Sequence, residues 1–303
     1  MYLALADTFT NVIALFAIAL GIGILIRFLG HLGCLAVVPA LNIFGFPMSY
    51  AVGTGTAHLF ARAIVDTFRQ GTMTNPDFRR GILLGLQTAA GVSIGKVILL
   101  TLAGLNLTGA PVRWIYIVLL IAAGIALARN RGPNGLPQLP RTAGLLPFVG
   151  LFAGILTGFT GASGAIVLIP AMTILGMTRE RASATAALAM LLAAGWGTFT
   201  FALGGRVEAV AVLVLVAGST IGEQIGLIFE RRVPNFTVRK PGCILLITTG
   251  LALALKQFGL TTPGGYLLWG TSLLVVVFVV IRAIVGTRLK APDSDPAVNK
   301  ILV

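Results

Sequence analysis

Long apolar runs follow one another along almost the whole chain. Nine of them have roughly 16 to 24 residues, close to the about 20 helical residues that cross the hydrocarbon core of a bilayer. They lie at about residues 10–30, 51–68, 81–104, 113–128, 143–160, 182–203, 207–229, 241–257 and 264–286. Only 10% of the 303 residues are charged, whereas soluble domains have about 25%. The sequence therefore predicts an all-α integral membrane protein, a polytopic helical bundle.

The charge balance and the cysteines exclude other classes. Lys and Arg number 22 against 9 Asp and Glu, which gives a net charge of +13. Nucleic-acid binding needs such cations gathered on one water-facing surface, but here they form short clusters between apolar runs, so we expect no nucleic-acid partner. Cys34 and Cys243 lie far apart inside apolar runs and indicate neither a disulfide framework nor a metal site.

Two further apolar runs are too short to cross a bilayer. Residues 34–45 and 164–176 have about 12 or 13 residues each. Each run follows a glycine-rich break, Gly30-His31-Leu32-Gly33 in the first case and Gly161-Ala162-Ser163-Gly164 in the second. A short helix after such a break is typical of a re-entrant or discontinuous element, and the sequence leaves both forms open.

The two breaks are copies within an internal repeat. A shift of 131 positions superposes residues 21–57 on 152–188, and a second, slightly shifted similarity pairs residues 90–95 with 217–222. The matched positions of the first alignment include Gly23, Gly30, Gly33, Pro39, Gly45 and Thr54, which pair with Gly154, Gly161, Gly164, Pro170, Gly176 and Thr185. We expect a first transmembrane repeat at 1–128, a cytoplasmic basic linker at 129–142, a second repeat at 143–258, and an extra C-terminal helix with a cytoplasmic tail at 259–303.

Loop charges predict the orientation, because cytoplasmic loops are enriched in Lys and Arg. Four basic segments, near residues 69–80, 129–141, 231–240 and 288–300, can all be cytoplasmic together. This assignment makes the two repeats inverted copies, with the N-terminus outside and the C-terminus inside. The expected location is the cell's inner membrane, crossed many times.

Inverted repeats with matched broken helices are typical of secondary transporters, which bind substrate where the breaks meet. Non-helical backbone is tolerated in a membrane only where protein buries it or where it lines a wet cavity. The N–H groups of the short helices can bind an anion there, with close approach allowed by Gly30, Gly33, Gly161 and Gly164. The alternative is that these glycines only pack helices together.

The same residues resemble the TauE/SafE family of sulfite and organosulfur anion exporters. The resemblance covers roughly residues 10–258 and is carried in the first half by Gly30 to Gly33, Pro39-Ala40-Leu41 and Gly53-Thr54-Gly55. In the second half it is carried by residues 158–164, Pro170-Ala171-Met172 and Ala184-Thr185-Ala186. It implies a membrane transporter for sulfite, thiosulfate or sulfonates such as sulfoacetate. The family's turn is commonly a run of glycines, from which His31 and Ser163 depart.

Ionisable residues at membrane depth predict the binding site, because they are costly there. Arg27 and His31, and likewise His58 and Arg62, are four residues apart, which would place each pair on one helix face, and Asp66 follows by another four. The second half has Gly158, Ala162, Ala189, Ala193 and Gly197 at the equivalent positions. We interpret Arg27, His31 and Arg62 as the cationic lining of an anion site. The alternative for Arg62 and Asp66 is a ladder with Arg69 that reaches the interface.

Other residues are weaker candidates. The hydroxyl groups of Thr54, Ser163 and Thr185 could donate to the substrate, or only bond to their own helices. A proton-carrying or gating role is predicted for His58, Asp66, Lys96 and Glu223. Lys96 and Glu223 could instead lie near an interface or be paired internally.

We therefore expect a transporter that exports a small sulfur-containing anion by alternating access. An anion channel, or a transporter of a non-sulfur organic anion, stays open as an alternative. A membrane-embedded enzyme subunit is less favoured, because the sequence has no paired-histidine haem spacing, no cysteine cluster and no carboxylate-rich site. We expect no enzymatic activity, cofactor or metal. The expected partners are the anion and the lipid bilayer, and a homodimer is left open.

Overall fold

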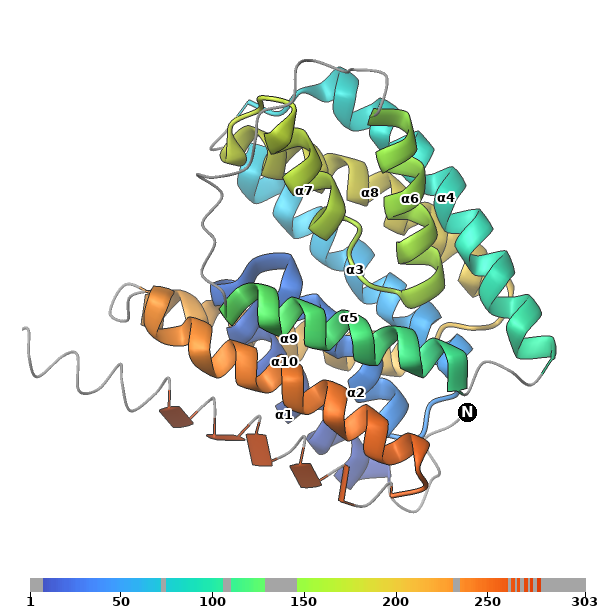
Figure 1. The fold of residues 1–303 in the computed structure, drawn as a ribbon, viewed down its shortest axis with the longest axis vertical. Coiled ribbons are helices and arrows are strands. Elements are labelled where there is room, and N and C mark those ends of the chain that lie inside the picture. The colour runs from blue at the N-terminus through green and yellow to red at the C-terminus, as the bar shows by residue number, and fades with distance from the viewer. Residues whose placement is uncertain are drawn as a thin grey trace, which may run out of the picture.

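The computed structural model describes residues 8–71, 75–105, 110–128, 146–230 and 235–260, and single positions between 263 and 278. These residues form helices and short connections without a strand (Figure 1). The first five α-helices are α1 (Thr8–Leu29), α2 (Val37–Ile43), α3 (Met48–Gly71), α4 (Phe78–Gly104) and α5 (Ala110–Ala128). The others are α6 (Leu146–Thr160), α7 (Ala165–Ile174), α8 (Arg179–Leu203), α9 (Ala209–Glu230) and α10 (Asn235–Gln257). A 3-10 helix, η1 (Gly30–Ala36), connects α1 to α2.

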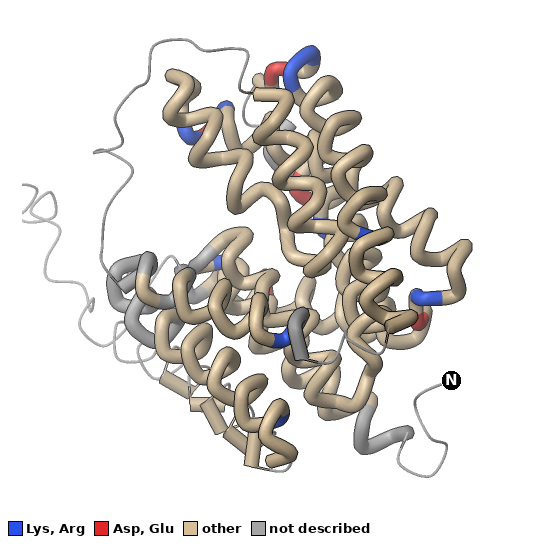
Figure 2. Tube along the Cα trace, turned by 45° about the vertical axis from the view of Figure 1, so that its right-hand side comes forward, with Lys and Arg blue, Asp and Glu red and all other residues tan. Residues whose placement is uncertain are grey.

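The predicted helical membrane class is confirmed. Three of the described helices are long and apolar enough to cross a bilayer, namely Phe78–Gly104, Arg179–Leu203 and Ala209–Ile228, and shorter apolar helices accompany them. The nine predicted crossings stay a prediction, because several of those runs extend beyond the described residues. The predicted linker at 129–142 lies outside the described residues, as does most of the C-terminal helix at 264–286. Figure 2 shows how rarely charged residues interrupt the described helices.

The two predicted helix breaks are confirmed. Helix α1 ends at Leu29, and Gly30 has a φ of 63°; α6 ends at Thr160, and Gly161 has a φ of 67°. This left-handed conformation is open to glycine but rarely adopted by residues with a side chain. The chain therefore leaves the helix at the same point in both copies, and a short helix follows each break, α2 after η1 and α7 after Gly164.

Two helix bundles form around the breaks, and each contains segments from both halves of the chain (Figure 1). In one bundle α1 packs along α9, with α2 beside them and the α5–α10 pair at its edge. In the other, α4 packs along α6 and α8, and α7 packs on α6 and α8. Helix α3 lies at the junction, against α8 on one side and against α2 and α9 on the other.

Glycines bring the main helix pairs into backbone contact. A Cβ atom added at Gly154 of α6 would overlap the carbonyl oxygen of Thr88 in α4, and one at Gly222 of α9 would overlap the carbonyl oxygen of Leu20 in α1. Small residues allow this close approach. In a membrane the hydrophobic effect does not drive helices together, so van der Waals packing between close helices contributes to their association.

We predict that Gly154→Ala lowers the free energy of unfolding by about 1–3 kcal/mol, because α4 and α6 must separate to accept the methyl group. The matched control is Gly104→Ala at the end of α4, where an added Cβ meets nothing within 4 Å. Chemical unfolding in detergent measures both. Equal stability of the two variants would contradict the close packing of α4 on α6.

Candidate functional site

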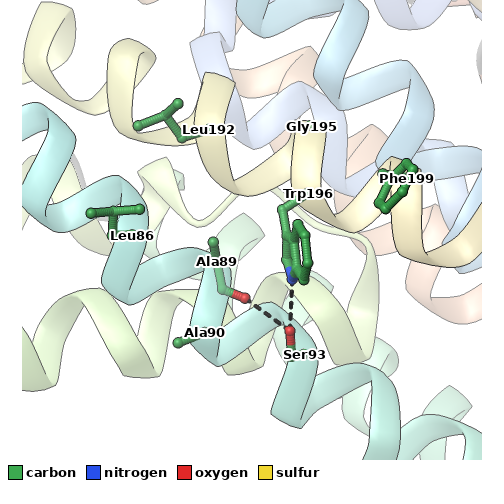
Figure 3. A pocket seen from close by; sticks show the side chains of 8 residues that line it. All are labelled: Leu86, Ala89, Ala90, Ser93, Leu192, Gly195, Trp196 and Phe199. Carbon is green, nitrogen blue, oxygen red and sulfur yellow. Dashed lines mark hydrogen bonds between the residues drawn. The ribbon is translucent and has the colours of Figure 1, made fainter.

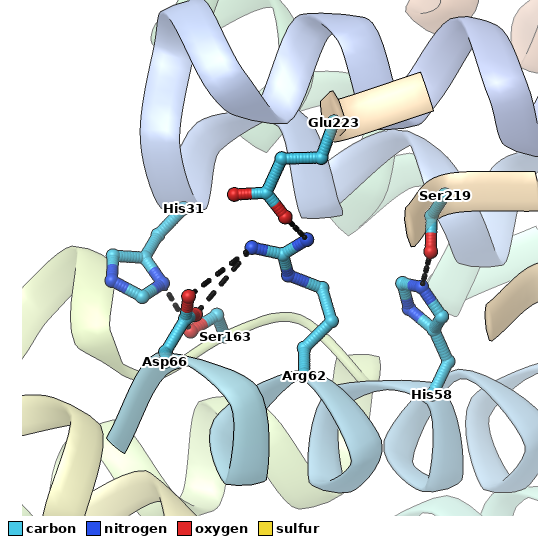
Figure 4. A network of polar contacts seen from close by, with 7 residues as sticks. All are labelled: His31, His58, Arg62, Asp66, Ser163, Ser219 and Glu223. Carbon is cyan, nitrogen blue, oxygen red and sulfur yellow. Dashed lines mark hydrogen bonds and ion pairs between the residues drawn. The ribbon is translucent and has the colours of Figure 1, made fainter. Parts of the chain in front are cut away.

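Three ionisable side chains follow one another along α3 at intervals of one helical turn. His58 and Asp66 are buried, and the Arg62 side chain is 12% exposed (Figure 4). The prediction that they share one face of a helix holds for this series. In a membrane protein such groups must find partners inside the bundle, because lipid offers none.

Arg62 lies between two carboxylates. Its Nη1 donates to Oε2 of Glu223 in α9 at 2.9 Å, and its Nη2 lies 3.4 Å and 3.5 Å from the two oxygens of Asp66. Glu223 is thus paired with a cation across the bundle, which was one of the roles considered for it. The Glu223 contact is the shorter and joins different helices, so it holds the guanidinium in position, whereas Asp66 contacts it more loosely from the next turn of α3.

His58 has a partner that the sequence analysis missed. Its Nε2 lies 2.9 Å from the hydroxyl oxygen of Ser219 in α9. Ser219 precedes Glu223 by four residues, just as His58 precedes Arg62. Two pairs with the same helical spacing in different segments are the signal that could have indicated this contact.

The two helix breaks meet at this cluster. The hydroxyl oxygen of Ser163, in the second break, lies 3.4 Å from Nδ1 of His31, in the first (Figure 4). The thiol of buried Cys34 in η1 lies within electrostatic reach of Arg62 and Asp66. Side chains from η1, α3, α9 and the α6–α7 break therefore surround one polar site.

The prediction that Arg27 and His31 share a helix face is wrong. Helix α1 ends at Leu29, Gly30 turns the chain, and His31 belongs to the 3-10 helix. The four-residue spacing therefore spans a break and not a helical turn. The stem of Arg27 packs beside Gly226 of α9.

The predicted threonines make matching contacts elsewhere. The Thr54 hydroxyl oxygen accepts a hydrogen bond from the backbone N–H of Glu208 at 3.2 Å. The Thr185 hydroxyl oxygen accepts a hydrogen bond from the backbone N–H of Asp77 at 3.1 Å. Both the threonines and their partners are related by the 131-residue shift. Each hydroxyl thus binds the backbone just before the first residue of α9 or α4 and ties the two halves together.

The remaining candidates, apart from Gly30, lie in packed surroundings. Lys96 donates to the Thr200 carbonyl oxygen at 2.6 Å and lies over the Phe201 ring, so it is paired internally. Among the predicted glycines, Gly33 packs on Ile26, Gly164 on Ala153, and Gly161 on Val38. An added Cβ at Gly30 meets nothing within 4 Å, which leaves this backbone the most accessible of the four.

A separate hollow of about 570 Å³ lies between α4 and α8 (Figure 3). Its lining is apolar apart from the Ser93 hydroxyl and the indole N–H of Trp196, which donates to that hydroxyl at 2.8 Å. None of the residues that line it carries a charged side chain.

The family model described as sulfite exporter TauE/SafE matches residues 15–253, which includes both breaks and every residue of the polar site. The chain belongs to the TauE/SafE sulfite exporter family. No solved structure matches it.

Two curated relatives are similar to this TauE/SafE chain over part of its length. Sulfite exporter TauE/SafE family protein 1 of Arabidopsis thaliana is 24% identical over 127 residues, which are 41% of this chain and 27% of that protein. A probable membrane transporter protein of Methanocaldococcus jannaschii is 26% identical over 171 residues, 54% of this chain and 62% of that protein. The chain thus matches less than two thirds of either relative.

We predict that Arg62→Ala costs about 3–5 kcal/mol of stability, because it leaves buried carboxylates without this cation. Adding Glu223→Gln should restore part of the loss. The control is Arg80→Ala, since Arg80 is 52% exposed and pairs with Asp77 at the surface, where a salt bridge contributes about 0–1 kcal/mol. Chemical unfolding measures the free energy of unfolding of each variant. If Arg62→Ala lowers it as little as Arg80→Ala does, the buried pair of Arg62 and Glu223 does not form.

Proposed function

We propose that this protein is a membrane transporter that exports a small sulfur-containing anion, such as sulfite, thiosulfate or an organosulfonate, by alternating access. The observation that carries the proposal is the meeting of the two helix breaks, through His31 and Ser163, beside the buried guanidinium of Arg62. Membership of the TauE/SafE family supports the sulfur anion as the substrate class.

The proposed anion site has Arg62, His31 and Ser163 at its centre. The planar guanidinium group offers paired donors that match the oxygens of sulfite or a sulfonate. The His31 ring and the Ser163 hydroxyl add donors from the two breaks. Arg27 contributes positive charge from α1. Thr54 and Thr185 serve in this proposal as ties between the halves.

Alternating access would move one bundle against the other. The 131-residue shift exchanges α1, α2, α3 and α4 with α6, α7, α8 and α9, and it converts the α1–α9 pair into the α6–α4 pair. Such an arrangement supports inverted repeats that meet where α3 packs on α8. The proposed orientation has the N-terminus outside and the C-terminus in the cytoplasm. An inside-negative potential favours the export of net negative charge by about 2.3 kcal/mol per charge per 100 mV.

We predict that sulfur anions raise the melting temperature of the purified protein, because a ligand that binds only the folded state stabilises it by about 2.7 kcal/mol at 100 times its Kd. The screen should include sulfite, thiosulfate, sulfoacetate, taurine and simple carboxylates. His31→Ala should weaken binding more than tenfold, while the surface variant Arg80→Ala should leave it unchanged.

If carboxylates raise the melting temperature of the protein and sulfur anions do not, the proposed substrate class is wrong. Equal affinity of the His31→Ala variant and the natural protein would remove the proposed site. Uptake into liposomes of the anion that binds best then tests transport itself.

A further inference from the structure

Asp66 stands on the side of Arg62 where a substrate anion would bind. In Figure 4 Asp66 is drawn on the same side of Arg62 as His31 and Ser163, whereas Glu223 reaches the guanidinium from above. Both edges of the guanidinium are occupied, Nη1 by Glu223 and Nη2 by Asp66. An anion that reaches Arg62 from the breaks therefore meets a carboxylate already in place.

The carboxylates of this cluster outnumber the cation that joins them. Arg62 contacts both Asp66 and Glu223, which gives one positive charge against two negative charges. The other described ionisable groups of the cluster are His58 on α3 and His31 and Cys34 in η1. Residues 182–203 of α8, which pack along α3, contain no ionisable side chain, and neither do α2, α6 and α7.

A substrate anion would therefore add an uncompensated negative charge to a buried site. Such a charge is very costly in a low-dielectric interior. Uptake of one proton by a carboxylate removes this cost, and it also frees the donors which that carboxylate occupied. Asp66 is better placed than Glu223 for this role, because it lies on the side of the breaks and its contact with Arg62 is longer.

We infer that Asp66 is a titratable internal competitor for the anion, and that each anion binds together with one proton on the Asp66 carboxylate. This inference rests on the proposed transport function and deepens it. In the empty site the ionised Asp66 pairs with Arg62; in the loaded site the protonated Asp66 gives up the Nη2 edge to the anion. A monovalent sulfonate would then cross the membrane with a proton and without net charge. The membrane potential would not act on this export, which the sulfonate gradient would drive and an inward proton gradient would oppose.

The test is isothermal titration calorimetry of the full-length protein with methanesulfonate between pH 6 and pH 9, in two buffers of different ionisation enthalpy. Methanesulfonate stays fully ionised over this range, so any proton taken up goes to the protein. We expect one proton per anion, with the apparent Kd rising about tenfold per pH unit on the alkaline side. Asp66→Asn should take up no proton and bind with a Kd that does not depend on pH.

Two further variants make the test specific. Glu180→Gln, the same type of change at an exposed position at the start of α8, should keep the uptake of one proton. His31→Gln should bind more weakly but also keep it. If Asp66→Asn retains the proton uptake, or folds normally but no longer binds the anion, the inference is overturned.

If Asp66→Asn does not fold, the inference is tested by the proton uptake of the natural protein when it binds methanesulfonate. Binding of methanesulfonate without proton uptake would then overturn the inference and leave the proposed function intact. If thiosulfate and methanesulfonate both fail to bind the natural protein at every pH, the proposed function fails, and this inference fails with it.

Discussion

The buried ion pair between Arg62 of α3 and Glu223 of α9 sets the spacing of the helices around the site. A guanidinium inside a membrane bundle needs partners at short distance, and Glu223 supplies a carboxylate at 2.9 Å. The equivalent face of α8 has Ala189, Ala193 and Gly197, and there the helix packs directly on α4. The chain thus uses one of two equivalent interfaces for tight packing and the other for a polar site.

The helix breaks explain why the polar site lies where it does. Backbone that leaves the helix in a membrane must be covered by protein or face a wet cavity. The second break is covered, because Gly161 lies against Val38 and Val52, whereas Gly30 of the first break is open. The more open of the two equivalent glycines thus lies in the half of the chain that also carries Arg62 and both histidines.

Much of this arrangement could be predicted from local sequence. The glycines at 30 and 161 indicated the breaks, and the spacing of His58, Arg62 and Asp66 indicated a shared face, because both features depend on a single segment. The Arg27–His31 pair failed because a helical spacing was extended across a break. The sequence analysis missed contacts between segments far apart, including Ser219 with His58 and Thr54 with Glu208, since they depend on the register between packed helices.

The central claim is that an anion binds between the two helix breaks at Arg62. A crystal structure with 2-bromoethanesulfonate tests it most directly, because anomalous scattering from bromine locates the ligand without ambiguity. The account predicts a sulfonate within hydrogen-bond distance of Arg62, His31 and Ser163, with the Asp66 carboxylate moved off the guanidinium. A sulfonate bound elsewhere, with Asp66 still on Arg62, would contradict it.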